Sequence, residues 1–423
     1  MENMRRFLNK IRYIIGNGFF KNITKDFFLN ILASIFSTGV MQLVVYPCMA
    51  QSLSSLDYGT MLTVMGYVNV ITLALGNNLC NARLVQQVKY NEKGYIGDFQ
   101  FLVILMSFIS IISIGLCCLA MKVSIGVTMG VTVATVATLV KSYYMVTYRI
   151  EVNYIKNLLA NIFIGVGYII GVVILIKFLK WPWVFLFGCL MGLLYIYTSS
   201  SIIKEPLKKT PLFWDSFRVT MTLAIGGLVS NATTYLDRFM IYPILGGESV
   251  SIYATAAFFA KSLNLLLAPI TSVLLSYLAS KRIILNKKKF ITLNIAMAVM
   301  GGIFWMLTVS FGCLITGILY PTLIGNAYKY IPYVSLGIIV GIVGAFSSVV
   351  VLACAPIKWQ TILPIIKIII YFILGYKLIS TNGLMGLCFA VIITNMCMFI
   401  ATFVVGFIAV NNNKGDKDGK VSN

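Results

Sequence analysis

Three ionisable side chains stand inside two adjoining apolar stretches, where the lipid of a bilayer would surround them. Asp237 and Arg238 lie in the run 217–245, and Lys261 lies in the run 250–278. Each run exceeds the roughly 20 residues that cross a bilayer at about 1.5 Å of rise per residue. A charge at that depth costs roughly 2.5 to 3.5 kcal/mol unless it faces water or an opposite charge. The three residues therefore predict a polar cavity inside a membrane protein.

The acid and the lysine lie at similar depths in the two runs. If the chain turns back near Gly246 and Gly247, the depths of Asp237 and Lys261 differ by about three residues, or roughly 4.5 Å. The lysine side chain is long enough to reach the carboxylate. Arg238 directly follows Asp237, so the two lie about 100° apart around a helix, and we expect the guanidinium to find a separate partner.

Each of these residues has a functional and a structural interpretation. Lys261 could bind an anionic headgroup, or it could serve only as the partner of Asp237. Arg238 could hold phosphate oxygens through its planar guanidinium, or it could extend toward the membrane surface. Asp237 is a candidate for coupling transport to an ion, and the alternative is that it only balances the nearby cations.

Three further basic residues are candidate ligands for an anion. Lys367 lies in the run 361–379, three residues after Pro364, so a kink at the proline would turn its side chain inward. Lys141 is close to one end of its run and could instead extend to the interface. Arg83 closes the second helix, where it either gates the inner mouth of the cavity or simply marks a cytoplasmic helix end.

The composition is that of a polytopic membrane protein. Of the 423 residues, 59% are hydrophobic and only 11% are charged, whereas soluble domains carry about 25% charged residues. The sequence has no histidine, so it offers neither a histidine metal ligand nor a histidine base. Its nine cysteines lack the C-x-x-C spacing of metal and redox sites, and no glycine-rich loop forms a nucleotide site. We expect no cofactor and no metal.

Twelve apolar runs predict an all-α integral membrane protein with two bundles of six helices. The chain divides into a basic interfacial segment at the cytoplasmic face (1–26), a first bundle (27–203), a cytoplasmic linker (204–216), a second bundle (217–410) and a disordered tail (411–423). We place the runs at 27–46, 59–79, 101–121, 123–144, 158–176, 181–203, 217–245, 250–278, 290–315, 331–355, 361–379 and 384–410.

The net charge of +21 follows the expected membrane topology. Lysines and arginines gather at the two termini and in alternate loops, which is the positive-inside pattern and places both termini in the cytoplasm. We therefore expect contact with membrane lipids and none with nucleic acid. The loops are too short for a soluble catalytic domain, so we do not expect an enzyme. The basic residues that lie more than two positions from the end of a run are Lys141, Arg238, Lys261 and Lys367.

The region around the two central runs resembles a known family. The segment YLDRFMIYPILGGESVSIYATAAFFAKSLNLLLAP resembles the seventh and eighth helices of bacterial lipid-linked oligosaccharide flippases, the O-antigen type in the polysaccharide-export branch of the MOP (MATE-like) transporter superfamily. The turn LSSLDYGTM, Asn81 to Arg83, and the pair Tyr148 and Arg149 are similar too. Ser251 departs from the pattern, since the family usually has glycine there.

The resemblance implies a MATE-like fold with a V-shaped central cleft between two bundles. It implies a transporter of the bacterial inner membrane that moves undecaprenyl-pyrophosphate-linked sugars by alternating access for O-antigen or capsule synthesis. A proton or sodium ion would be the coupling ion, and a polysaccharide polymerase and chain-length proteins would be partners.

Two alternatives stay open beside the flippase. The first is an ion-coupled MATE-type exporter of small cationic compounds, in which acids rather than lysines would face the cleft. The second is a membrane enzyme that acts on lipid-linked glycans, which would need catalytic acids or bases, or a large outer loop.

Overall fold

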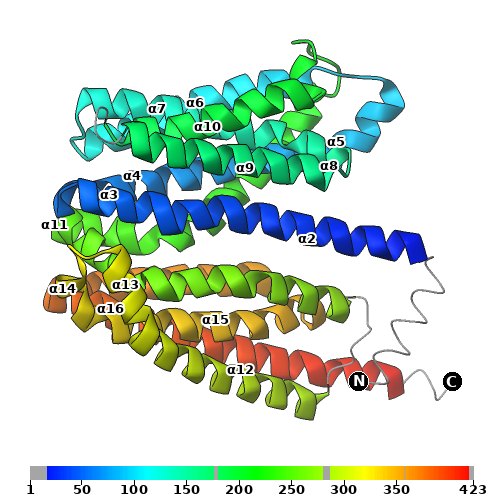
Figure 1. Cartoon of the computed structure of the whole chain (residues 1–423). Coiled ribbons are helices and arrows are strands. Elements are labelled where there is room, and N and C mark those ends of the chain that lie inside the picture. The colour runs from blue at the N-terminus through cyan, green and yellow to red at the C-terminus, as the bar shows by residue number, and fades with distance from the viewer. Residues whose placement is uncertain (1–16, 176–179, 280–285, 357, 419–423) are drawn as a thin grey trace. The chain divides into compact units, whose positions relative to one another are not determined.

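The structure is a computed structural model, and the residues that it describes form helices with no strand among them (Figure 1). The all-α membrane fold expected from the sequence is therefore confirmed. Within the described part, nine helical segments are long and apolar enough to cross a membrane. The described residues are 17–175, 180–279, 286–356 and 358–418.

Two of the long helices each contain a pair of arms. The segment Ile362–Val410 is one of the nine, and its arms meet at Gly383. Helix α11 (Phe213–Ala279) is not among the nine, and its arms meet at Gly246. When the arms are counted separately and those of α11 are included, the described helices match the twelve predicted runs.

Glycine is required at both of these junctions. Gly246 has φ 79° and ψ 176°, and Gly383 has φ 59° and ψ −141°. Side chains with a Cβ rarely adopt such backbone angles, so each glycine lets the chain turn sharply between two helical arms.

The chain forms two compact units that differ from the predicted bundles. Unit 1 comprises Met1–Met49 and Tyr67–Ala232, and unit 2 comprises Ala50–Gly66 and Thr233–Asn423. The boundaries thus fall within α3 (Tyr46–Ser52), within α4 (Ser55–Thr72) and within α11, not at the linker 204–216. Packing explains the assignment of residues 50–66: Gly59 lies so close to Gly247 that a Cβ at Gly59 would be 1.7 Å from the Gly247 carbonyl oxygen.

In unit 1, helices pack side by side in the order α2, α9, α10, α7 and α6 (Figure 1). A buried aromatic cluster lies among the fully buried side chains of Tyr90, Phe99 and Tyr143. The elements are α2 (Asn17–Val40), η1 (Met41–Val45), α3 (Tyr46–Ser52), η2 (Leu73–Asn77), α5 (Asn78–Lys93), α6 (Asp98–Ala120), α7 (Ile125–Tyr144), α8 (Val146–Ile150), α9 (Tyr154–Ile170), η3 (Gly171–Leu175), α10 (Pro182–Ser199) and η4 (Ile202–Lys204).

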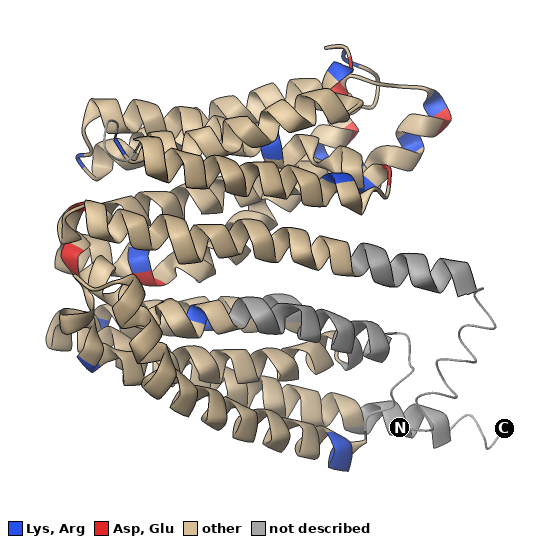
Figure 2. Cartoon of the chain, viewed as in Figure 1, with Lys and Arg blue, Asp and Glu red and all other residues tan. Residues whose placement is uncertain are grey.

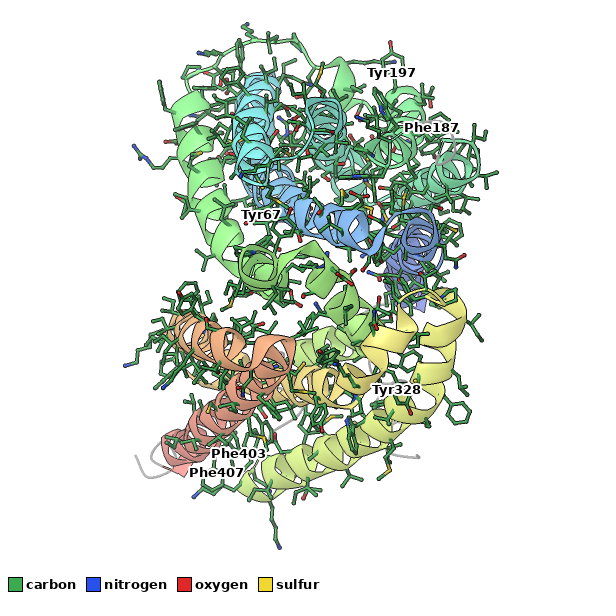
Figure 3. The ribbon with its side chains drawn as sticks, turned by 90° about the vertical axis from the view of Figure 1, so that its left-hand side faces the viewer. Tyr67, Phe187, Tyr197, Tyr328, Phe403 and Phe407 are labelled. Carbon is green, nitrogen blue, oxygen red and sulfur yellow. The ribbon has the colours of Figure 1, made fainter. Side chains whose placement is uncertain are left out.

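In unit 2, α15 packs along α16, and α12 packs against α15. The stacked rings of Phe403 and Phe407 on α16 are 6.2 Å apart and join a cluster around Phe290 (Figure 3). The elements after α11 are α12 (Lys287–Leu307), η5 (Thr308–Gly312), α13 (Cys313–Leu319), α14 (Ile324–Ala327), η6 (Tyr328–Tyr330), α15 (Ile331–Cys354) and α16 (Trp359–Asp418).

Both ends of the described chain differ from the predicted boundaries. Residues 1–16 of the predicted interfacial segment lie outside the described residues, and the rest of that segment belongs to α2, which continues into the first span. At the other end, α16 continues past Val410 to Asp418, so most of the predicted tail is helical, while 419–423 lie outside the described residues. Extending an existing helix costs little, because each added residue gains one backbone hydrogen bond.

Candidate functional site

Charged residues gather mainly near the helix ends, and long stretches without charge lie between them (Figure 2). A few charged residues lie away from the helix ends, among apolar side chains. In unit 2 they line two neighbouring cavities that share Thr233, Lys367 and Asn395.

The first cavity, which we call the charged cavity, has a volume of about 130 Å³. The second, which we call the Trp359 chamber, has a volume of about 310 Å³. Arms of α11 and α16 contribute to both, and α15 supplies a further wall. The charged cavity contains Asp237, Lys261 and Lys367 among its lining residues.

Asp237 and Lys261 form a salt bridge across the two arms of α11. The Lys261 ammonium lies 2.5 Å from Asp237 Oδ2. The Asp237 side chain is 8% exposed and that of Lys261 is 38% exposed, so the carboxylate is the buried partner. Lys261 Nζ also lies 5.9 Å from the centre of the Tyr253 ring. The contact that the depths of the two residues predicted is therefore confirmed.

Arg238 faces a different neighbour from Asp237, as the helical angle between them predicted. Its Nη1 donates a hydrogen bond to the carbonyl oxygen of Leu62 in α4 at 2.9 Å, and its guanidinium lies 5.5 Å from the Tyr235 ring. Its backbone N–H donates to Asp237 Oδ1 at 2.9 Å. The side chain is not among those that line the two cavities. Its role in substrate binding stays a prediction.

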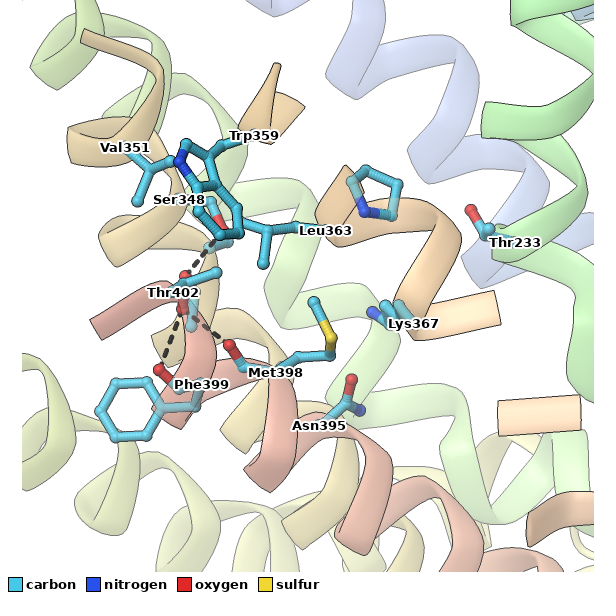
Figure 4. Close-up of a pocket in the computed structure, with 14 residues that line it drawn as sticks. Thr233, Ser348, Val351, Trp359, Leu363, Lys367, Asn395, Met398, Phe399 and Thr402 are labelled. Carbon is cyan, nitrogen blue, oxygen red and sulfur yellow. Dashed lines mark hydrogen bonds between the residues drawn. The ribbon is translucent and has the colours of Figure 1, made fainter. Parts of the chain in front are cut away.

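Lys367 lines both cavities, and no carboxylate among the described residues pairs with it. Among the described residues, its side chain takes part in no ion pair and no hydrogen bond. Figure 4 shows its ammonium group directed into the cavity, with Asn395 on the facing helix arm. Asn395 uses its amide nitrogen to donate to the carbonyl oxygen of Gly337 at 2.8 Å. Among the described residues of its lining, the charged cavity has one carboxylate, Asp237, against two lysines, so this surface carries net positive charge.

Arg83 lies in unit 1, in a buried ion pair. Its Nη2 is 2.6 Å from Glu205 Oε1, its Nε donates to Gln87 Oε1 at 3.0 Å, and its guanidinium lies over the rings of Tyr90 and Phe99. Burial raises the pKa of the Glu205 carboxyl, and the Arg83 guanidinium lowers it only in part. The contact fastens the start of the linker to α5. Whether Arg83 also guards an opening stays a prediction.

Lys141 also lies in unit 1, in the last turn of α7. It is half-buried and lies along α10, since a Cβ added at Gly192 would be 3.6 Å from its Cδ. The structure therefore brings Asp237, Lys261 and Lys367 together in unit 2 and leaves Lys141 and Arg83 in the other unit.

The sequence analysis did not predict several cavity residues, among them Trp359, Tyr371 and Asn395. A signal for them existed in the helical spacing. Trp359 and Tyr371 lie eight residues before and four after Lys367, so the three share one face of a helix. Within the described residues, no group of three Cys, Asp or Glu side chains could hold a metal ion.

No family model and no curated protein matches this sequence. Among solved structures, an inward-facing multidrug resistance MATE family transporter of the MOP superfamily is 12% identical, with a TM-score of 0.68 over 91% of this chain and 96% of its own. The lipid II flippase MurJ, in an inward closed conformation, is 16% identical with a TM-score of 0.56, over 93% and 84%. The Vibrio cholerae MATE transporter VcmN, in its bent form, is 10% identical with a TM-score of 0.55, over 93% and 97%. The chain therefore has the fold that these proteins share.

Proposed function

We propose that this protein is a flippase of the bacterial inner membrane that moves undecaprenyl-pyrophosphate-linked oligosaccharide units for O-antigen or capsule synthesis. The observation that carries the proposal is the net positive lining of the charged cavity. Asp237 is already bonded to Lys261, which leaves the Lys367 ammonium without a counterion among the described residues. An ammonium at membrane depth favours an anionic ligand, because charge-assisted hydrogen bonds to phosphate oxygens replace its lost hydration.

The chemistry of the substrate fits this surface. A pyrophosphate headgroup cannot enter hydrocarbon without a partner for its charge, whereas the apolar tail of the lipid is stable in the bilayer. Lys367 would bind the pyrophosphate, and Lys261 could turn from Asp237 to the phosphate oxygens during transport. Asp237 would then be free to take a proton or a sodium ion, so it is our candidate for coupling. The fold is consistent with this function, since MurJ, whose solved structure is similar, is named a lipid II flippase.

The second candidate function is export of small cationic compounds. We consider it because the solved structures with a similar fold include MATE family transporters. Such a compound would need a carboxylate free of other partners. In the charged cavity Asp237 is bonded to Lys261, and a cationic ligand would also lie close to Lys367. The charge of the lining therefore favours the flippase over the exporter, and the absence of a histidine from the sequence disfavours an enzyme that needs a histidine base.

Deletion of the gene separates the two candidates. In cells that lack the protein, we expect undecaprenyl-pyrophosphate-linked repeat units to accumulate and surface polysaccharide to fall, measured by mass spectrometry of the lipid extract. A lipid extract unchanged from that of the parent strain, combined with greater sensitivity to cationic drugs, would contradict the flippase and favour the exporter.

A further inference from the structure

We infer that the Trp359 chamber holds the first part of the prenyl chain of the lipid, so that Lys367 binds the phosphate attached to that chain. The inference rests on the proposed function and assigns a second subsite to it. Apolar side chains make most of the wall: Val351, Trp359, Leu363, Pro364, Met398 and Phe399 (Figure 4).

The polar groups of the chamber have few donors to offer a ligand. The Ser348 hydroxyl donates to the Gly344 carbonyl oxygen at 3.1 Å, and the Thr402 hydroxyl donates to the Met398 carbonyl oxygen at 2.8 Å. The Asn395 amide nitrogen is bonded to Gly337, as described above. In Figure 4 the indole nitrogen of Trp359 lies on the side of Val351, away from Lys367.

A chamber with an apolar wall and few free donors favours the hydrocarbon chain of the substrate over its sugars. A sugar presents many hydroxyl groups, each of which needs donors as well as acceptors, and burying it here would leave several of them unsatisfied. A hydrocarbon chain has no such need and gains free energy when it leaves water. The volume of about 310 Å³ lies at the lower end of ligand pockets, which suits one part of a ligand rather than a whole saccharide unit.

Charge fixes the direction of the ligand. Lys367 is the ionisable residue in the lining of the chamber, and it also lines the charged cavity. A phosphate at Lys367 would therefore have the charged cavity on one side and the apolar chamber on the other. That is the order of groups in a prenyl pyrophosphate, in which hydrocarbon follows directly after the phosphate.

Binding of short analogues to the purified protein tests the inference. We would measure the affinities of farnesyl pyrophosphate and of inorganic pyrophosphate by isothermal titration calorimetry, with farnesol and a short-chain phosphatidic acid as further ligands. We expect the wild-type protein to bind farnesyl pyrophosphate at least about tenfold more tightly than inorganic pyrophosphate, since burial of two methylene groups suffices for that factor.

Filling the chamber should remove this difference. Ser348→Leu places a larger side chain in the chamber and breaks only a bond to its own helix. We expect it to bind farnesyl pyrophosphate no better than inorganic pyrophosphate, with the affinity for pyrophosphate unchanged. Met398→Phe fills the chamber from α16 and serves if the first variant does not fold. Ser380→Leu is the matched control, because Ser380 is exposed and bonds only to the Tyr376 carbonyl oxygen of its own helix.

The outcomes separate this inference from the proposed function. If the wild-type protein binds both pyrophosphates equally, or if filling variants that fold bind farnesyl pyrophosphate as the wild type does, the chamber does not hold the chain, while the flippase proposal stands. If phosphatidic acid binds as tightly as farnesyl pyrophosphate, the prenyl assignment is wrong. If neither pyrophosphate binds, both the inference and the anion-binding cavity are contradicted.

Discussion

At the scale of single residues, the pair Asp237 and Lys261 shows how a charge is kept at membrane depth. The carboxylate is almost fully buried and would be costly alone, but it accepts bonds from the Lys261 ammonium and from the backbone of Arg238. The lysine is more exposed and can change partners at less cost. We therefore expect Lys261, rather than Asp237, to be the residue that changes partners during transport.

We predict that Lys261→Ala abolishes glycan export and lowers the free energy of unfolding by about 1 to 3 kcal/mol, because it removes a hydrogen-bond donor from a buried carboxylate. Lys261→Arg should keep part of the export. Thermal unfolding of the detergent-purified protein measures the loss of stability, and a surface glycan profile measures export.

The double variant Asp237→Asn with Lys261→Ala separates structure from transport. It should be less destabilised than the sum of the single variants, since no buried charge is left unpaired. It should nonetheless fail to export. Normal export by Lys261→Ala would remove this lysine from the mechanism.

At the scale of helices, close packing at glycine positions holds the start of α4 against the hinge of α11. Gly246 supplies the turn, and Gly59 and Gly247 allow the backbones to approach. A hydroxyl contact of 2.8 Å between Ser55 and Ser251 lies in the same region. Ser251, where the resembling family usually has glycine, thus has a structural use in this chain.

Gly59→Ala should destabilise the protein by about 1 to 3 kcal/mol or more, because the added Cβ would overlap a backbone oxygen that cannot move alone. Gly302→Ala in α12 is the control, since a Cβ there meets nothing within 4 Å. Melting temperatures of the two purified variants check this. Equal melting temperatures would show that the backbones separate more easily than the packing implies.

The sequence allowed the helices and one contact of the site to be predicted, for physical reasons. Apolar runs that are long enough to cross a membrane predict helices, and the similar depth of Asp237 and Lys261 in adjoining runs was enough to predict their contact. The partner of Arg238 could not be predicted, because it is a backbone carbonyl 176 residues away, and every residue has one. The continuation of α16 past Val410 was missed because polar composition was taken as the end of the helix.

The lining of the cavities was only partly predictable. Lys367 stood out as a charge in an apolar run, whereas Trp359 and Asn395 belong to types that are common on membrane helices. Their shared cavity depends on how α15 and the two arms of α16 pack, and helical spacing alone does not fix that packing.

At the scale of the whole molecule, the basic residues predict the orientation of the chain in the membrane. Lys204, Lys208 and Lys209 lie in the linker before α11, whereas the turn at Gly246 and Gly247 carries an acid and no lysine. By the positive-inside rule, we predict that the linker faces the cytoplasm and that the turn faces the opposite side.

Labelling of single cysteines checks this orientation. In a background without the nine native cysteines, Glu248→Cys should react with a membrane-impermeant maleimide added to intact spheroplasts, and Lys208→Cys should react only after the membrane is opened. Both positions are exposed in the structure, so access across the membrane decides the result. The reverse pattern would contradict the predicted topology.

Our central proposal is that the Lys367 ammonium, which has no counterion among the described residues, binds the pyrophosphate of a lipid-linked glycan. Its most direct test is the rate at which proteoliposomes flip a fluorescent undecaprenyl-pyrophosphate-linked oligosaccharide. Lys367→Ala should lower that rate at least about tenfold, the factor expected when a hydrogen bond to a charged group is lost. Lys377→Ala, an exposed lysine on the same arm of α16, should flip at the wild-type rate. A wild-type rate for Lys367→Ala, or no flipping by the wild-type protein itself, would contradict the claim.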